Sequence, residues 1–178
     1  MKKTFLILLL MFSLLIGCNG PSIVKLEFET FSVSDTNISN SDFVYDFEFI
    51  HSYEKLYSLQ NKIKVYYSDA NFNFKEEDLI NSKILLIQTQ KRSITDSFSL
   101  TKVGYQDGAI IIESTYEKVY WNVHMPAIAY SFIKIPKDKE LETLELNVTY
   151  LIQQKELEKY TKDKLKIKIS LKGDNQNI

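Results

Sequence analysis

Hydrophobic and polar residues alternate along much of the chain, which is the pattern of a β-strand with one buried face. The segment KILLIQTQ, residues 83–90, contains four consecutive apolar residues, 84–87. This run instead predicts a strand in the centre of a sheet. The alternating segments are residues 24–29, 43–50, 144–152 and 165–171. Further strands are predicted at residues 97–105, 109–115, 119–125 and 128–135.

Two short segments break this pattern. In residues 53–59 the apolar side chains recur at helical spacing, and Ser52 just before them is a good N-terminal cap. These features predict a short helix near residues 52–62. Asp107 and Gly108 separate two predicted strands, and Asp-Gly is typical of the tight turn of a β-hairpin.

The whole pattern predicts a mainly β (α+β) fold. Its strands are expected to form an antiparallel sheet sandwich or a partly open barrel with one short helix. The chain has 11 Phe and 11 Tyr but only 5 Gly, a balance typical of a packed β domain. No internal repeat or linker divides residues 22–178, so residues 18–178 are interpreted as a single domain.

The N-terminus has the features of an export signal. Lys2 and Lys3 precede a twelve-residue apolar run, residues 5–16, which is too short to cross a bilayer as a helix. The following Leu15-Ile16-Gly17-Cys18 closely resembles the lipobox of bacterial lipoproteins. That resemblance implies that residues 1–17 are removed as a signal peptide and that the thiol of Cys18 carries lipid. Residues 18–22 are then a short tether.

The lipobox also implies a location. The domain is expected outside the cytoplasm, held at a membrane by the lipid and acyl chain (such as palmitate) on Cys18. The next residue, Asn19, is not the Asp that retains some lipoproteins at the inner membrane of enteric bacteria. An outer-membrane or cell-surface location is therefore favoured.

Residues 43–136 resemble the C-terminal domain of PrcB-like protease-complex subunits. The order of elements is similar: an aromatic strand, a helix beginning at Ser52, an apolar strand at residues 84–87, and a closing Ile133-Lys134-Ile135-Pro136. The chain lacks the Thr-Gly-Gly-Tyr-like turn of that family, and reads ITDSF at residues 94–98. Members are often lipoproteins, and the resemblance implies a role in stabilising a secreted protease complex.

Charge and cysteine content exclude several function classes. The formal net charge is −1, and the chain has a single Arg, Arg92, so no basic field favours nucleic acid. Cys18 is the one cysteine, so no intramolecular disulfide can form. A lipid on Cys18 also makes its thiol unavailable for redox, metal or nucleophilic chemistry.

The candidate chemical groups form no recognisable catalytic or metal-binding set. His51 and His124 stand outside any metal-binding motif, and the acidic triplet Glu76-Glu77-Asp78 lacks the spacing of a calcium loop. No nucleophile motif or phosphate-binding glycine loop is present. The sequence therefore predicts neither a cofactor nor an enzyme.

Two sets of side chains are candidate surfaces. Aromatic residues gather at Tyr116, Tyr120, Trp121, Tyr130 and Phe132. Core packing is one interpretation of them, and an interaction surface formed by Tyr120, Trp121 and Tyr130 is the other. Alternate lysines in the last strand (Lys164, Lys166, Lys168 and Lys172) can protect a sheet edge, pair with carboxylates or meet anionic lipid.

These observations favour a lipid-anchored extracytoplasmic β-domain protein that is not catalytic. It is expected to bind or stabilise another exported protein, for example in a protease complex. The alternatives are a surface antigen or adhesin, a lipoprotein that binds a small ligand, and an enzyme.

Overall fold

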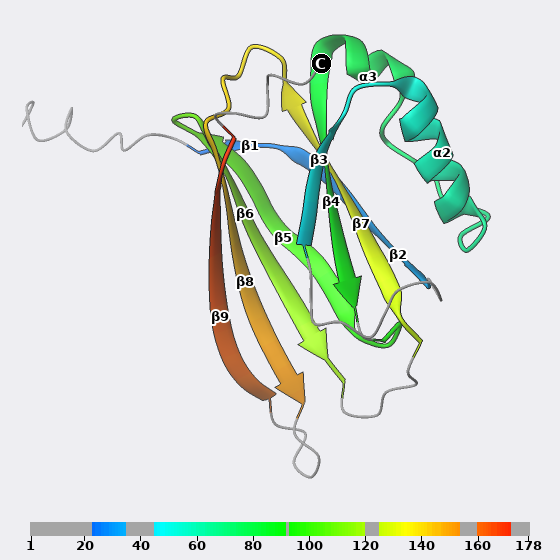
Figure 1. The fold of residues 1–178 in the computed structure, drawn as a ribbon, viewed down its shortest axis with the longest axis vertical. Helices are drawn as coiled ribbons and strands as arrows, with labels where there is room; N and C mark the ends of the chain where they lie inside the picture. Colours follow the sequence, from blue (N-terminus) through cyan, green and yellow to red (C-terminus); the bar gives the residue numbers. More distant parts are fainter. Residues whose placement is uncertain (1–22, 35–44, 92, 120–124, 154–159, 172–178) are drawn as a thin grey trace, which may run out of the picture.

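Two β-sheets and two helices form three layers (Figure 1). The structure, a computed structural model, describes residues 23–34, 45–91, 93–119, 125–153 and 160–171. The five-stranded sheet has the order β1-β5-β6-β8-β9, and the four-stranded sheet has the order β2-β7-β4-β3. Their strands are β1 (Val24–Lys25), β2 (Glu27–Ser34), β3 (Tyr45–Ile50), β4 (Ser82–Lys91), β5 (Ser97–Gln106), β6 (Ala109–Lys118), β7 (Ala127–Pro136), β8 (Thr143–Gln153) and β9 (Tyr160–Ser170).

The four-stranded sheet is covered on both faces. In β4, Leu85 and Ile87 point into the core between the sheets, whereas Ile84 and Leu86 point into a second core beneath the helices. Strand β7 divides its side chains in the same way, which explains why nearly all of it is buried. A strand covered on both faces needs apolar residues at consecutive positions, as in residues 84–87.

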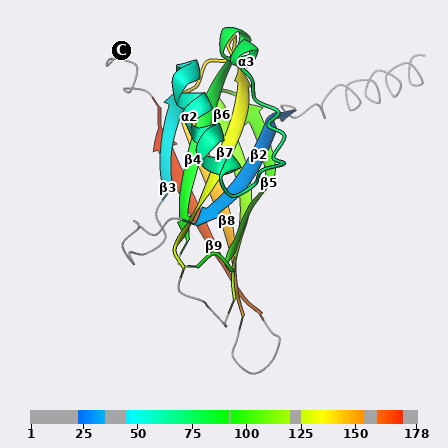
Figure 2. The ribbon, with the colours of Figure 1, turned by 90° about the vertical axis from the view of Figure 1, so that its right-hand side faces the viewer.

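The helical layer consists of α2 (Tyr53–Lys64) and α3 (Glu76–Asn81). Figure 2 shows α2 lying across β4 and β7. The hydroxyl of Ser52 accepts a hydrogen bond from the backbone N–H of Lys55, as expected for an N-terminal cap. On the inner face of α2, Leu56 and Ile63 are fully buried in the second core.

One continuous segment joins the two sheets. Strand β1 pairs with β5 in the five-stranded sheet, and after Leu26 the chain continues as β2, which pairs with β7 in the other sheet. The backbone N–H of Leu26 donates to the carbonyl of Val103, and the Leu26 side chain is buried between the sheets. The sandwich is therefore closed along this side, while β3 and β9 are the edge strands of the two sheets on the opposite side.

The predicted fold class is confirmed. The described strands form a sandwich of two sheets that do not close into a barrel, and the helix predicted near residues 52–62 is α2. The predicted central strand, KILLIQTQ, lies between β7 and β3 as β4. One pair of strands differs from the antiparallel expectation: β6 and β8 run parallel, because the chain returns through β7 of the other sheet before it adds β8. The strand predicted at residues 119–125 falls mostly outside the described residues.

The hairpin between β5 and β6 turns at Asp107 and Gly108, as the sequence predicts. Both residues have positive φ angles, 47° and 79°. Two successive positive φ values are typical of a two-residue turn that matches the twist of the flanking strands.

Replacement of Gly108 with Ala should lower the free energy of unfolding by about 1–2 kcal/mol. The added Cβ would adopt a disfavoured φ and would lie 2.9 Å from Cγ of Glu142. Urea unfolding followed by circular dichroism measures the change. The matched variant Asp107→Gly relieves a positive φ and should leave stability unchanged or slightly raised; equal losses in both variants would contradict this account of the turn.

Candidate interaction surface on the helical layer

Large apolar side chains are exposed mainly on the helical layer. Tyr57 is 50% exposed, Val65 is 81% exposed and Ile80 is 67% exposed. We define the helical-layer patch as Tyr53, Tyr57, Val65, Tyr66, Tyr67 and Ile80. Exposed aromatic residues are enriched at protein–protein contact sites, because they bury a large area and lose little conformational freedom.

The two faces of α2 explain why these side chains remain outside. Leu56 and Ile63 already fill the inner face, so Tyr53 and Tyr57, one turn apart, project from another face with their ring centroids 5.8 Å apart. The helix ends at Lys64, and the next residue, Val65, has no apolar surface to cover it.

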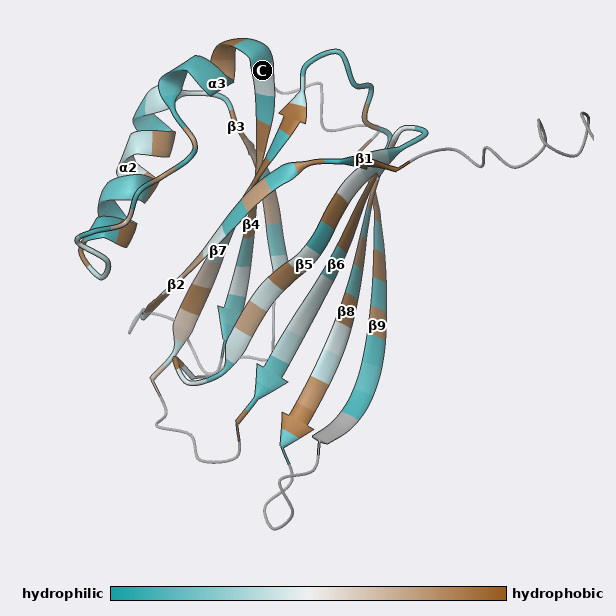
Figure 3. Ribbon diagram, turned by 180° about the vertical axis from the view of Figure 1, so that it is seen from behind, coloured by the Kyte–Doolittle hydropathy of each residue, from teal (hydrophilic) through white to brown (hydrophobic). Residues whose placement is uncertain are grey.

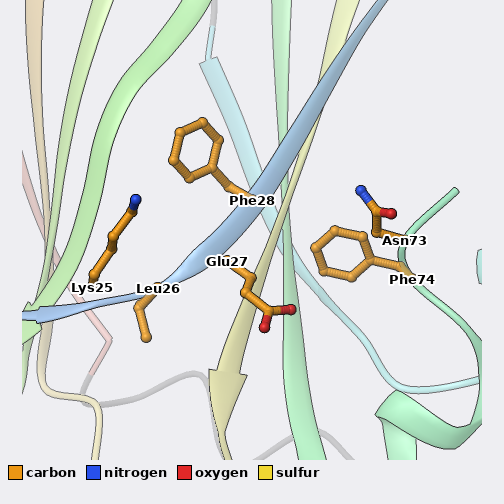
Figure 4. A pocket seen from close by; sticks show the side chains of 6 residues that line it. All are labelled: Lys25, Leu26, Glu27, Phe28, Asn73 and Phe74. Carbon is orange, nitrogen blue, oxygen red and sulfur yellow. The ribbon is translucent and has the colours of Figure 1, made fainter.

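Two grooves lie on either side of the segment that follows α2, and both contact Phe74. The smaller groove, about 230 Å³, lies between this segment and α2 and is lined by Tyr53, Gln60 and Phe72 among others. The larger groove, about 600 Å³, lies beside the start of β2. Figure 4 shows Phe28 on one side of β2 and Phe74 with Asn73 on the other, with the Glu27 carboxylate directed toward Phe74.

A group of charges borders the larger groove. The ammonium of Lys134 lies 3.0 Å from a carboxylate oxygen of Glu27, 2.8 Å from one of Asp78, and 5.7 Å from the centre of the Phe74 ring. Burial disfavours the charged forms of both Lys134 and Asp78. The ion pair between them outweighs this effect of burial, so the pKa of Lys134 is raised and the pKa of Asp78 is lowered. This group connects β2, β7 and α3.

Glu29 lies in the same region and is harder to ionise. Burial raises its pKa, although the backbone N–H of Asn73 donates to its Oε2 at 3.1 Å. Its Oε1 is buried and has no hydrogen-bond partner among the described residues. A perturbed carboxyl beside a groove marks a candidate site, and the charges of Lys134 and Asp78 act on this one.

The free edge of β2 is covered by the segment that borders these grooves. The Tyr67 hydroxyl donates to the carbonyl of Ser32, and the rings of Phe31 and Phe72 are 4.8 Å apart. The same segment therefore protects a sheet edge and presents Val65 and Tyr66 to solvent.

A buried polar group lies at the end of the sandwich away from the β5–β6 turn. Lys91 and Asp96 are 3% and 1% exposed, and the Lys91 ammonium donates to the backbone carbonyl of Asp96 at 2.8 Å. The Asp96 carboxylate accepts the Tyr116 hydroxyl at 2.7 Å and the Val119 N–H at 3.2 Å. Because Lys91 belongs to one sheet and Tyr116 to the other, this group ties the sheets together.

His51 precedes α2, and the acidic triplet begins α3. His51 is exposed beside Phe49, and His124 lies outside the described residues. Glu76, Glu77 and Asp78 occupy the first turn of α3, where carboxylates favour the helix dipole. Within the described part of the chain, no group of three or more His, Cys, Asp or Glu side chains could hold a metal ion.

The aromatic residues predicted near the middle of the chain are divided between the two cores. Tyr116 packs between the sheets, and Tyr130 and Phe132 pack beneath α2, where Tyr130 is only 2% exposed. Tyr130 therefore serves packing in this structure and is not part of an exposed surface. Tyr120 and Trp121, the other two members of the predicted surface, lie outside the described residues, as does Cys18.

The helical-layer patch has no separate signal in the sequence. Tyr53 and Tyr57 fit the apolar pattern of the predicted helix, so the pattern does not distinguish them from core residues. Only the orientation of α2 on the sheet shows that Leu56 is buried while Tyr57 is exposed.

Comparisons with protein-family models, curated proteins and solved structures give no match. The resemblances to lipoproteins and to PrcB-like subunits therefore stay predictions. No helix in the described ranges is long and apolar enough to cross a membrane.

Replacement of Lys91 with Met should increase stability at neutral pH. Burial lowers the pKa of Lys91 from 10.5 to about 8 in the folded chain. Between pH 8 and pH 10.5 the unfolded chain binds more protons than the folded chain. The free energy of unfolding of the parent chain should therefore rise with pH over that range. The variant should lack this rise, which is worth about 3 kcal/mol at most. Urea unfolding at a series of pH values measures it.

The matched control is Lys102→Met, because the Lys102 side chain is 54% exposed. Its stability should follow the same pH profile as the parent chain. A Lys91→Met profile that runs parallel to the parent from pH 7 to above pH 10 would show that the buried ammonium does not destabilise the fold.

Proposed function

We propose that this chain is a lipid-anchored extracytoplasmic protein that is not catalytic and binds or stabilises another exported protein. The observation that carries the proposal is the helical-layer patch, whose exposed residues include Tyr57, Val65 and Tyr66. The anchor is proposed from Leu15-Ile16-Gly17-Cys18, which resembles a lipobox. One candidate partner is a secreted protease complex.

The geometry of the helical layer supports a protein partner over a small ligand. The patch extends over α2, the residues just after it and α3, and the two grooves beside it are open at the surface. A partner surface can cover the tyrosines and place a side chain into the groove beside Phe74. Small ligands instead favour concave sites that bury most of their surface.

The charges of the helical layer indicate what the partner surface contains. Glu54, Glu76 and Glu77 are exposed on the helices, and Glu27 is exposed beside the larger groove. The same layer also exposes Lys55, Lys62, Lys64 and Lys75, so a complementary partner carries apolar residues for the patch and charges of both signs at its rim. Charge complementarity of this kind increases the rate of association and selects among partners.

Substitution of Tyr57, Val65 and Tyr66 by Ser should abolish partner capture without unfolding the domain. These side chains are exposed, so their removal leaves both cores intact, whereas truncation of a central aromatic side chain in an interface costs about 1–2 kcal/mol of binding free energy. Crosslinking in intact producing cells, followed by purification of this chain, should yield a higher-mass species that decreases tenfold or more in the variant.

The control removes three exposed apolar residues elsewhere: Val24→Ser, Met125→Ser and Leu165→Ser. This variant should retain the crosslinked species. Recovery of the monomer alone from the parent chain would contradict the proposal, and equal loss in both triple variants would contradict the assignment of the patch.

The Cys18→Ala variant should lose membrane association. The proposed lipid is the anchor, and each buried acyl CH₂ contributes about 0.8 kcal/mol. Detergent-phase partitioning and mass spectrometry of the N-terminal peptide measure the change. Retention of the lipid mass on the variant, or its absence from the parent chain, would disprove the anchor.

A further inference from the structure

Four lysines form one row on the outer face of β9. Lys162, Lys164, Lys166 and Lys168 are all exposed and alternate with residues of the opposite face. Ile167 and Ile169 pack against the core between the sheets, so the lysines point away from it. Figure 3 shows β9 as the edge strand of the five-stranded sheet, with hydrophobic and hydrophilic residues alternating in its upper part.

The positive charge of this row is only partly neutralised. Lys166 and Lys168 both contact the carboxylate of Glu145, at 3.0 Å and 2.9 Å, so two ammonium groups share one acid. Within the described ranges, neither Lys162 nor Lys164 lies at ion-pair distance from a carboxylate. The row therefore keeps excess positive charge. A row serving only pairing across strands would have matched acids on β8.

The surface next to the row suits contact with a polar layer. Register places Thr149 and Asn147 of β8 opposite Lys164 and Lys166, and Thr115 of β6 beside Thr149. A shallow depression of about 520 Å³ is lined by these residues together with both lysines and with Glu113, whose carboxylate lies 3.8 Å from the ammonium of Lys102. Its hydroxyl and amide groups can donate hydrogen bonds to phosphate oxygens beside the ammonium groups.

The opposite side of the molecule has the reverse charge. The helical layer and the outward face of its sheet carry more carboxylates than lysines. The carboxylates are Glu27, Glu29, Asp46, Glu48, Glu54, Asp69, Glu76, Glu77 and Asp78, and the lysines are Lys55, Lys62, Lys64, Lys75 and Lys134. On the outer face of the five-stranded sheet, Lys102 and the four lysines of β9 outnumber Glu113, Glu117 and Glu145. A negative surface therefore attracts one side and repels the other.

The chain enters the domain at the end of the sandwich where the row of lysines on β9 also ends. Strand β1 pairs with β5 next to the β5–β6 turn, and the carbonyl of Gly108 in that turn accepts the N–H of Glu142. The N–H of Leu171, just after β9, donates to the carbonyl of Glu142. Four residues separate Cys18, the proposed site of the lipid, from Ile23, so the two Cα atoms lie at most about 18 Å apart. The sheet is therefore held close to the bilayer.

We infer that the outer face of the five-stranded sheet binds the anionic phospholipid headgroups of the membrane that anchors the chain. The helical-layer patch, on the far side of the four-stranded sheet, then faces away from the bilayer and toward the partner. This inference rests on the lipid anchor of the proposed function, but not on the identity of the partner. Interfacial lysines attract anionic leaflets over about one Debye length.

The test compares lysine reactivity on two kinds of vesicle. The full lipidated chain is reconstituted in vesicles of phosphatidylcholine alone or with added phosphatidylglycerol, and floated protein is labelled with an amine-reactive reagent and analysed by mass spectrometry. Labelling of Lys162, Lys164, Lys166 and Lys168 should fall roughly fivefold on the anionic vesicles. High salt should restore it. Equal labelling on both vesicles would overturn the inference and leave edge protection as the role of the row.

Two charge-matched variants separate this face from net charge. Replacing Lys162, Lys164, Lys166 and Lys168 with Gln should abolish the salt-sensitive preference for anionic vesicles. Replacing Lys55, Lys62, Lys64 and Lys75 with Gln changes the net charge equally and should preserve that preference. The same loss in both variants would overturn the assignment to β9, with circular dichroism checking that each variant is folded. Flotation with neutral vesicles reports the lipid anchor separately, so failure of the anchor is distinguishable from failure of the lysine face.

Discussion

The structure depends on burial of both faces of the four-stranded sheet. Consecutive apolar residues in β4 leave no face that can be exposed to water at low cost, since burial of each large aliphatic side chain is worth about 1.5–3 kcal/mol. One face requires the second sheet and the other requires α2. The three-layer arrangement follows from this requirement, and it places α2 on the outside of the molecule (Figure 2).

Closure of the sandwich along one side has a second consequence. The continuous segment β1–β2 belongs to both sheets, and the residues after α2 cover the outer edge of β2. Edge strands otherwise pair with foreign chains. On the opposite side, the edge strand β9 carries its row of lysines on the outer face, which also disfavours edge-to-edge association. The two exposed surfaces of the molecule therefore have different chemistry, aromatic on the helical layer and basic on the outer face of the five-stranded sheet.

Polar groups in the interior connect the two sheets at one end of the sandwich. The ammonium of Lys91 is buried with one backbone carbonyl as its hydrogen-bond partner, and burial lowers its pKa. Burial of a charged group costs free energy that a hydrogen bond only partly offsets. Together with the bond between Tyr116 and Asp96, the Lys91 contact defines how the ends of β4 and β6 meet.

The sequence by itself determined the local elements. Alternation predicted the strands, the cap at Ser52 and the helical spacing after it predicted α2, and Asp107-Gly108 predicted the hairpin. These features depend on interactions within a few residues. Tertiary structure alone decided the parallel pairing of β6 with β8, the burial of Tyr130 and the exposure of Tyr57. An apolar pattern shows that a residue is suited to burial, but which of two similar tyrosines is covered depends on the direction in which distant elements pack against it.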